Sequence, residues 1–134
     1  MSGFEWTTLA TCAALILYIY MGVRVGGARA KYNVAAPAMS GDPIFERHFR
    51  VHLNTLEWLP VFLVSMWLFA LKWDDRIAAG LGAVWIIGRI IYMTSYVKDP
   101  KSRSAGFGIQ ALATLVLLGG AIWGAVSSLL TSVP

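Results

Sequence analysis

The chain has 134 residues, of which 57% are hydrophobic and only 13% are charged. Soluble domains carry about 25% charged residues, so this composition indicates an integral membrane protein. The formal net charge of +4 does not predict a nucleic-acid partner, because the basic residues flank apolar segments. The single cysteine, Cys12, excludes an intrachain disulfide and a cysteine-based metal motif.

Four apolar segments occupy nearly all of the length and predict one domain over residues 1–134, an all-α integral membrane four-helix bundle. We expect helices over residues 6–23, 43–71, 77–97 and 104–134, the first ending where charge begins at Arg24. Asp42 should cap the second helix, with Pro43 in its first position. Ser102 or Ser104 should cap the fourth helix.

The positions of lysine and arginine predict the topology. The first and third loops, with the helix ends beside them, hold nearly all of these residues, and both termini hold none. In the second loop, Lys72 and Arg76 are offset by Asp74 and Asp75. By the positive-inside rule, loops one and three face the cytoplasm. The lack of a recognisable targeting segment fits a bacterial inner membrane and an endoplasmic reticulum membrane equally.

A polar stripe runs along the second predicted helix. At 100° per residue, Arg50, Asn54 and Glu57 share one face, and Glu46 and Arg47 continue it one turn earlier. Ionisable groups at membrane depth are costly unless they face the bundle interior or a wet cavity, so a functional site is the first hypothesis. The alternative is a buried ion-pair network that only orients the helices.

The third predicted helix carries Arg89, Tyr92 and Tyr96 on one face. The tyrosines alone are typical of a membrane interface. An arginine two turns inside a span, however, needs an acidic or carbonyl partner, and we expect Glu46 or Glu57 to supply it.

Arg103 stands at the expected start of the fourth helix, where the helix dipole disfavours a cation. Taken alone, it is equally consistent with an ordinary arginine at the cytoplasmic flank. Next to a helix N-terminus, however, its guanidinium could stabilise an anion such as a thiolate. Because a free thiol has a pKa of about 8.5, a lowered pKa would provide the nucleophile at neutral pH.

Together, these residue types predict a small zwitterionic ligand with more than one carboxylate. Arginines can pair with carboxylates or a thiolate, a glutamate can receive an ammonium group, and amide and phenol groups can form hydrogen bonds. The residues are Arg29, Arg50, Asn54, Glu57, Tyr92, Tyr96 and Arg103. A ligand bound at the bilayer surface could meet a lipid-soluble second substrate.

The segment from Arg50 to Pro60 resembles the Arg-x-His-x-Asn-x-x-Glu-x-x-Pro signature of the membrane-associated proteins in eicosanoid and glutathione metabolism, the MAPEG family. Phe45-Glu46-Arg47, Gly88-Arg89 to Tyr96, and Arg103-Ser104 also fall at the family's spacing, so the resemblance covers most of the chain. The family includes microsomal glutathione transferase, microsomal prostaglandin E synthase and leukotriene C4 synthase.

The resemblance implies a homotrimer with glutathione bound at each subunit interface near the cytoplasmic side. Arg103 corresponds to the residue that activates the thiol. Glu46 and Arg89 correspond to structural partners, and Arg89 could also touch the ligand. The implied glutathione-binding residues are Arg29, Arg50, His52, Asn54, Glu57, Tyr92 and Tyr96. We therefore expect a glutathione transferase that acts in detoxification on lipophilic electrophiles, needs no metal, and could also reduce lipid hydroperoxides.

Several positions depart from individual branches of the family. Trp58 stands where the leukotriene enzyme has a tyrosine that contacts glutathione. Tyr92 resembles the leukotriene branch, whereas His52 resembles the other two. Ser104 matches a serine proposed to assist in the prostaglandin enzyme and is equally suited to capping a helix. The resemblance therefore identifies the family and not one of its branches.

Two other classes of protein remain open from the residues alone. Small multidrug transporters also have four helices in a short chain, but they place an essential glutamate midway along the first helix, and residues 6–23 contain no acid. A non-catalytic structural or lipid-binding bundle would use the polar residues only to hold its helices together.

Overall fold

The computed structural model describes residues 3–132, which form four long α-helices and no strand. The helices are α1 (Glu5–Tyr32), α2 (Pro43–Lys72), α3 (Asp75–Lys98) and α4 (Ser104–Ser132), and a short 3₁₀ turn, η1 (Pro100–Ser102), joins α3 to α4. All four are long and apolar enough to cross a membrane. The chain is therefore a multi-pass integral membrane protein of the expected all-α class.

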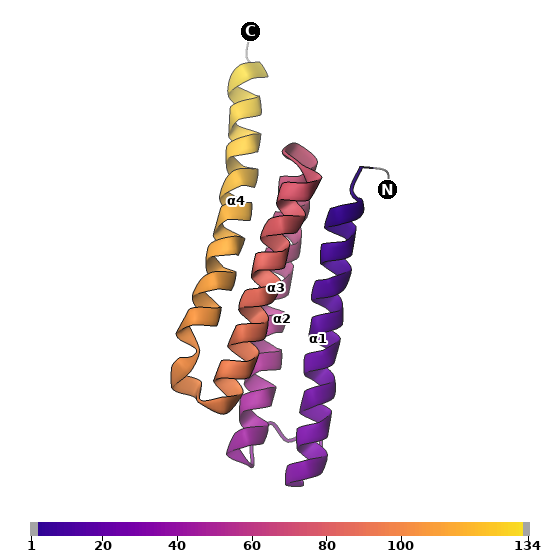
Figure 1. Cartoon of the computed structure of the whole chain (residues 1–134), viewed down its shortest axis with the longest axis vertical. Helices are drawn as coiled ribbons and strands as arrows, with labels where there is room; N and C mark the ends of the chain where they lie inside the picture. The colour runs from indigo at the N-terminus through magenta and orange to yellow at the C-terminus, as the bar shows by residue number, and fades with distance from the viewer. Residues whose placement is uncertain (1–2, 133–134) are drawn as a thin grey trace.

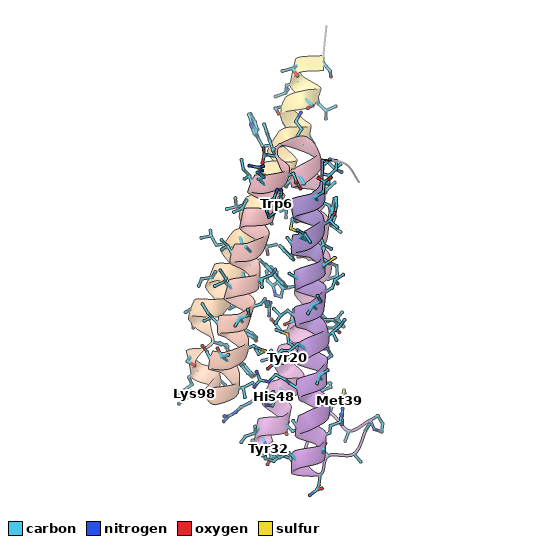
Figure 2. All side chains as sticks on the ribbon, turned by 45° about the vertical axis from the view of Figure 1, so that its right-hand side comes forward. Trp6, Tyr20, Tyr32, Met39, His48 and Lys98 are labelled. Atoms are coloured by element: carbon cyan, nitrogen blue, oxygen red, sulfur yellow. The ribbon has the colours of Figure 1, made fainter. Side chains whose placement is uncertain are left out.

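The helices run up and down, with α2 and α3 between α1 and α4 (Figure 1). Both α2 and α3 pack against the other three helices. The loop after α1 and the turn η1 lie at one end of the bundle, which we term the loop end; α1 begins and α4 finishes at the other, the terminal end. Figure 2 shows His48 and Lys98 near the loop end and Trp6 near the terminal end.

Helix α1 is longer than predicted, because it continues past Val23 to Tyr32. Its last turn contains Arg29 and Lys31, and cations there interact favourably with the helix dipole. Asn33 then ends the helix in the left-handed conformation, with φ of 55°, and donates its backbone N–H to the Arg29 carbonyl. The first charges therefore end the apolar segment but not the helix.

The start of α2 agrees with the prediction. The Asp42 carboxylate accepts hydrogen bonds from the backbone N–H groups of Ile44 and Phe45, at 2.8 and 3.3 Å. Pro43 occupies the first helical position, where a missing N–H group costs nothing. The bounds of α2 and α3 lie within two residues of those expected from hydropathy.

The start of α4 differs from the prediction at Ser102. Its hydroxyl donates to the backbone carbonyls of Ser95 and Asp99, at 3.0 and 2.7 Å, so it closes the end of α3 and does not cap α4. Ser104 is the first residue of α4 and so is not its cap either; the preceding residue, Arg103, accepts the first helical hydrogen bond, from the backbone N–H of Phe107. The helix extends to Ser132, and the last two residues of the predicted span, 133–134, lie outside the described range.

At the terminal end, the first residue of α3 caps the beginning of α1. The Asp75 carboxylate accepts hydrogen bonds from the backbone N–H groups of Trp6 and Thr7, at 3.1 and 2.8 Å. Backbone donors at a helix N-terminus otherwise lack partners, so this contact ties α1 to α3 far from the loop end.

Helices α3 and α4 are in backbone contact at two glycines. A Cβ atom added to Gly106 would lie 2.3 Å from the backbone nitrogen of Tyr92 and 2.7 Å from the carbonyl oxygen of Gly88. A Cβ atom added to Gly88 would lie 2.7 Å from the backbone nitrogen of Gln110. Small residues permit this close approach between membrane helices. The contact fixes where the beginning of α4 lies along α3.

Gly106→Ala should push α4 away from α3 and lower the free energy of unfolding by about 1–3 kcal/mol, as overpacking usually does. Gly119→Ala is the matched control in the same helix, because within residues 3–132 a Cβ atom added there has nothing within 4 Å apart from its chain neighbours and the backbone of its own helix. Thermal unfolding in detergent, followed by circular dichroism, should show a lower melting temperature only for Gly106→Ala. Equal melting temperatures for the two variants would contradict the close contact.

Candidate functional site

A cavity of about 570 Å³ lies near the loop end, between α2, α3 and α4. It is lined by Arg50, Leu53, Asn54 and Glu57 of α2, Tyr92 and Tyr96 of α3, Arg103 before α4, and Ser104, Phe107 and Gly108 of α4. The structure thus brings the predicted thiol-activating residue together with most of the predicted binding residues.

The α2 wall of the cavity is polar because its side chains recur at helical spacing. Arg50, Asn54 and Glu57 point to the cavity, while Val51 and Thr55 are buried in the bundle. Arg50 and Glu57 are exposed, and they are separated by about 10 Å along the helix axis. The wall therefore offers a cation and an anion to opposite ends of a zwitterionic ligand.

The opposite wall is aromatic and ends in a cation. The rings of Tyr92 and Tyr96 stack with their centroids 5.5 Å apart, and Phe107 approaches Tyr92 at 6.1 Å. Arg103 is exposed at the junction of η1 and α4. It lies one residue before α4, where backbone N–H groups and the helix dipole also favour an anion.

Arg89 lies behind the cavity, in the interior of the bundle. Its side chain is 0% exposed. Its Nη1 atom donates hydrogen bonds to Oδ1 of Asn54 at 2.8 Å and to Oγ1 of Thr55 at 3.4 Å. The guanidinium is therefore joined to α2 through neutral side chains, one of which lines the cavity.

The expected carboxylate partner of Arg89 is not found. Within residues 3–132, neither Glu46 nor Glu57 lies at ion-pair distance from Arg89, and Glu57 interacts with its charge only at longer range. Glu46 lies about 12 Å from Asn54 along the α2 axis, and it accepts a hydrogen bond from the backbone N–H of Gly41 at 3.1 Å. Glu46 therefore orders the loop before α2, while Arg89 meets the amide that faces it across the helix interface.

Arg29 lies outside the cavity and holds the first loop. Its Nη1 atom donates to the backbone carbonyls of Ala38 and Val34, at 2.8 and 3.5 Å. Its guanidinium carbon lies 4.8 Å from the centroid of the buried Phe45 ring, a cation–π contact. Arg29 therefore connects the end of α1, the loop and the start of α2.

His52 also lies outside the cavity, on the side of α2 that faces α1. Its ring stacks on that of Tyr18, with centroids 4.5 Å apart. A Cβ atom added to Gly22 would lie 3.3 Å from its Nε2 atom, so the imidazole sits close against α1. The predicted binding residues thus occupy two different faces of the chain.

Trp58, the departure from the leukotriene branch noted in the sequence, lies beside the cavity. Its ring meets Phe107 edge-on, with centroids 5.5 Å apart and an interplanar angle of 85°. Trp58 does not line the cavity and instead supports Phe107, which does.

Three apolar lining residues were missed by the sequence analysis, namely Leu53, Phe107 and Gly108. Apolar residues are common in membrane helices and carry no chemical signal. Only their spacing could have identified them, because Leu53 lies four residues before Glu57 and Phe107 four residues after Arg103.

Comparison with known proteins supports the relationship indicated by the motif. The MAPEG family model matches residues 7–123, which include the whole cavity lining. An uncharacterized protein from Synechocystis sp. is 46% identical over 87% of this chain and 85% of its own. Microsomal glutathione S-transferase 2 from Homo sapiens is 40% identical over 75% of this chain and 69% of its own. Leukotriene C4 synthase from Rattus norvegicus is 31% identical over 90% of this chain and 81% of its own.

Arg29→Ala should loosen the first loop, because hydrogen bonds from a charged donor are worth about 1.5–3 kcal/mol. Hydrogen–deuterium exchange across residues 33–42 should become about tenfold faster or more, as a loss of about 1.4 kcal/mol implies. Lys31→Ala, which removes an exposed cation of the same helix end, is the control. Similar exchange in both variants would contradict the role of Arg29 in holding the loop.

Proposed function

The chain belongs to the MAPEG family, and on that basis we propose that it is a membrane-bound glutathione transferase, which conjugates the glutathione thiolate to lipophilic electrophiles. The observation that carries this proposal is the cavity near the loop end, which collects two arginines, a glutamate, an asparagine and two tyrosines. Glutathione is a zwitterion with two carboxylates, one ammonium group and a thiol, and this set of side chains complements its charges.

The two walls of the cavity have different roles in this proposal. Arg50 pairs with a glutathione carboxylate. Glu57, about 10 Å farther along the same helix, receives the ammonium group. Asn54, Tyr92 and Tyr96 provide hydrogen bonds. The opposite wall, at Arg103, then receives the sulfur atom.

Arg103 acts by stabilising the thiolate. The thiol proton leaves to solvent, and the sulfur electron pair forms a carbon–sulfur bond with the electrophile. A leaving group then departs, or an added proton neutralises the anion that an addition or ring opening produces. Electrostatic stabilisation and proximity account for the rate in this scheme.

The apolar part of the wall is suited to the electrophile. Leu53, Phe107 and Gly108 line the same cavity as the charged residues, on helices that also face the bilayer. A lipophilic molecule could therefore reach the thiolate from the membrane without crossing water.

We further propose that the protein is a homotrimer whose sites are completed between subunits. Arg29 and His52 lie away from the cavity in one subunit. A cyclic assembly places one face of a subunit against a different face of the next. The face with Arg29 and His52 would then meet the cavity of a neighbour, where the guanidinium donors of Arg29 not used by the loop can reach the ligand.

We also propose that the loop end faces the cytoplasm. Its cations are Arg24, Arg29, Lys31, Arg47, Arg50, Lys98, Lys101 and Arg103. The terminal end carries Lys72 and Arg76 together with Glu5, Asp74 and Asp75. This asymmetry supports the orientation by the positive-inside rule.

Arg103→Ala should lower kcat about 100-fold, the usual effect of removing one donor that stabilises a developing anion, and change the KM for glutathione much less. Conjugation of a panel of lipophilic electrophiles and reduction of a lipid hydroperoxide measure turnover. Ultraviolet difference titration with glutathione near neutral pH measures the thiolate, whose signal should disappear in the variant. Arg24→Ala, which removes an arginine outside the cavity, is the control.

Equal losses of glutathione affinity and turnover in Arg103→Ala would assign Arg103 to binding alone. If the unmodified protein bound no glutathione by calorimetry, the transferase proposal would fail, and a structural or lipid-binding bundle would replace it.

Mixing two inactive variants tests the shared site. Subunits carrying Arg103→Ala and subunits carrying His52→Ala each lack one half of every site. Co-assembly should restore about a quarter of the sites in a cyclic oligomer, because each site then draws its halves from different subunits. Native mass spectrometry counts the subunits. Absence of any restored activity in mixed oligomers would place both residues in the same subunit's site, and full activity of His52→Ala alone would remove His52 from the site.

A further inference from the structure

Arg89 carries a charge in the interior of the bundle without the hydrogen bonds that such a charge requires. Its Nε and Nη2 atoms are buried and have no hydrogen-bond partner within residues 3–132. A buried cation with unpaired donors destabilises a fold relative to an apolar side chain of similar size. Holding the helices together is therefore not a sufficient explanation for Arg89.

The contacts that Arg89 does make lead to the cavity. Nη1 donates to Oδ1 of Asn54 at 2.8 Å, and the guanidinium carbon lies 4.9 Å from the centroid of the Tyr92 ring. Both partners line the cavity. On its other side, the guanidinium carbon lies 5.6 Å from the centroid of the buried Trp85 ring. Arg89 is thus held by aromatic rings immediately behind the ligand site.

The hydrogen bond determines which way the Asn54 amide points. A guanidinium has donors only, so the amide atom that faces it must be the oxygen. Reversing the amide would place N–H groups against N–H groups of a fixed cation. Because Asn54 is only partly buried and lines the cavity, its nitrogen is the amide atom left for a ligand.

We propose that Arg89 is a positioning residue, which holds the Asn54 amide with its nitrogen toward the cavity, so that this point of the site recognises a hydrogen-bond acceptor. A carboxylate or peptide carbonyl oxygen of the ligand fits that donor. The identity of this ligand as glutathione rests on the proposed function, whereas the orientation of the amide does not.

The orientation can be tested without any ligand, because Asn33 and Asn54 are the only asparagines in the chain. Nitrogen-15 labelling of asparagine gives two side-chain amide signals in detergent micelles, and exposed Asn33 is the internal reference. Arg89→Met removes the donors but keeps an unbranched side chain. It should move the Asn54 amide signals toward those of Asn33 and speed their rotation, while the Asn33 signals stay unchanged. Unaltered Asn54 signals would overturn the proposal.

Ligand recognition is tested with Asn54→Asp, which keeps the shape but replaces the donor facing the cavity with an acceptor. Glutathione affinity by calorimetry should fall about tenfold or more. The melting temperature should not fall, because the guanidinium gains a carboxylate partner. Undiminished affinity would show that the amide nitrogen does not contact the ligand, and would overturn the recognition role.

A double-mutant cycle separates positioning from direct action. Arg89→Met alone should weaken glutathione binding, but it should add little in an Asn54→Ala background. An equal loss in both backgrounds would mean that Arg89 acts on the ligand without Asn54. Arg76→Met, at the terminal end, is the control for removing an arginine. If the unmodified protein bound no glutathione, the transferase proposal would fail, and the amide signals would still decide the role of Arg89.

Discussion

The backbone contact between α3 and α4 determines the geometry of the site. Gly106 lies against the backbone of Tyr92, and Arg103 stands three residues before Gly106. Three residues are less than one helical turn, so Arg103 cannot move far from the tyrosines while the contact holds. A short turn, η1, makes the connection from α3 possible without a flexible loop. The position of the proposed catalytic cation thus depends on two residues that lack side chains.

The distribution of charge follows from the cost of burying it in a membrane. Arg50 and Glu57 are exposed to the cavity near the loop end, where water can solvate them. Arg89 is the exception, since it is fully buried among aromatic rings and the neutral groups of Asn54 and Thr55. Such a buried charge lowers the stability of the fold. The proposed positioning of the Asn54 amide explains why it is retained.

Much of the fold and the site could be predicted from the sequence, because both depend on local rules. Hydropathy located the four helices, and Asp42-Pro43 marked the start of α2. Helical spacing grouped Arg50, Asn54 and Glu57, which share the cavity. Its place before a helix start indicated Arg103, and the family resemblance gave it the role of activating the thiol. Its position beside Tyr92, however, depends on a contact between helices that no local pattern contains.

The errors have different physical origins. Helix α1 continues past Arg24, because charge limits burial in lipid but not helix formation. Ser102 bonds backward to α3, since a hydroxyl can serve either neighbouring helix. The hydrogen-bond partner of Arg89 depends on how α2 and α3 are positioned along each other, and this cannot be predicted from local sequence patterns. Spacing did contain one unused signal: His52 is two residues from Arg50, and therefore lies on nearly the opposite side of α2.

The position of His52 on the side of α2 opposite to Arg50 supports the proposed homotrimer. One set of candidate residues lines the cavity between α2, α3 and α4. The second set consists of Arg29, near the end of α1, and His52, on the side of α2 that faces α1. In one chain, only the first set lines the cavity, whereas a cyclic assembly would bring unlike faces together at every interface. Activity would then require assembly, and a subunit alone in the membrane would hold an incomplete site. In the proposed homotrimer, the second face of α2 would link the proposed catalysis to the formation of the oligomer.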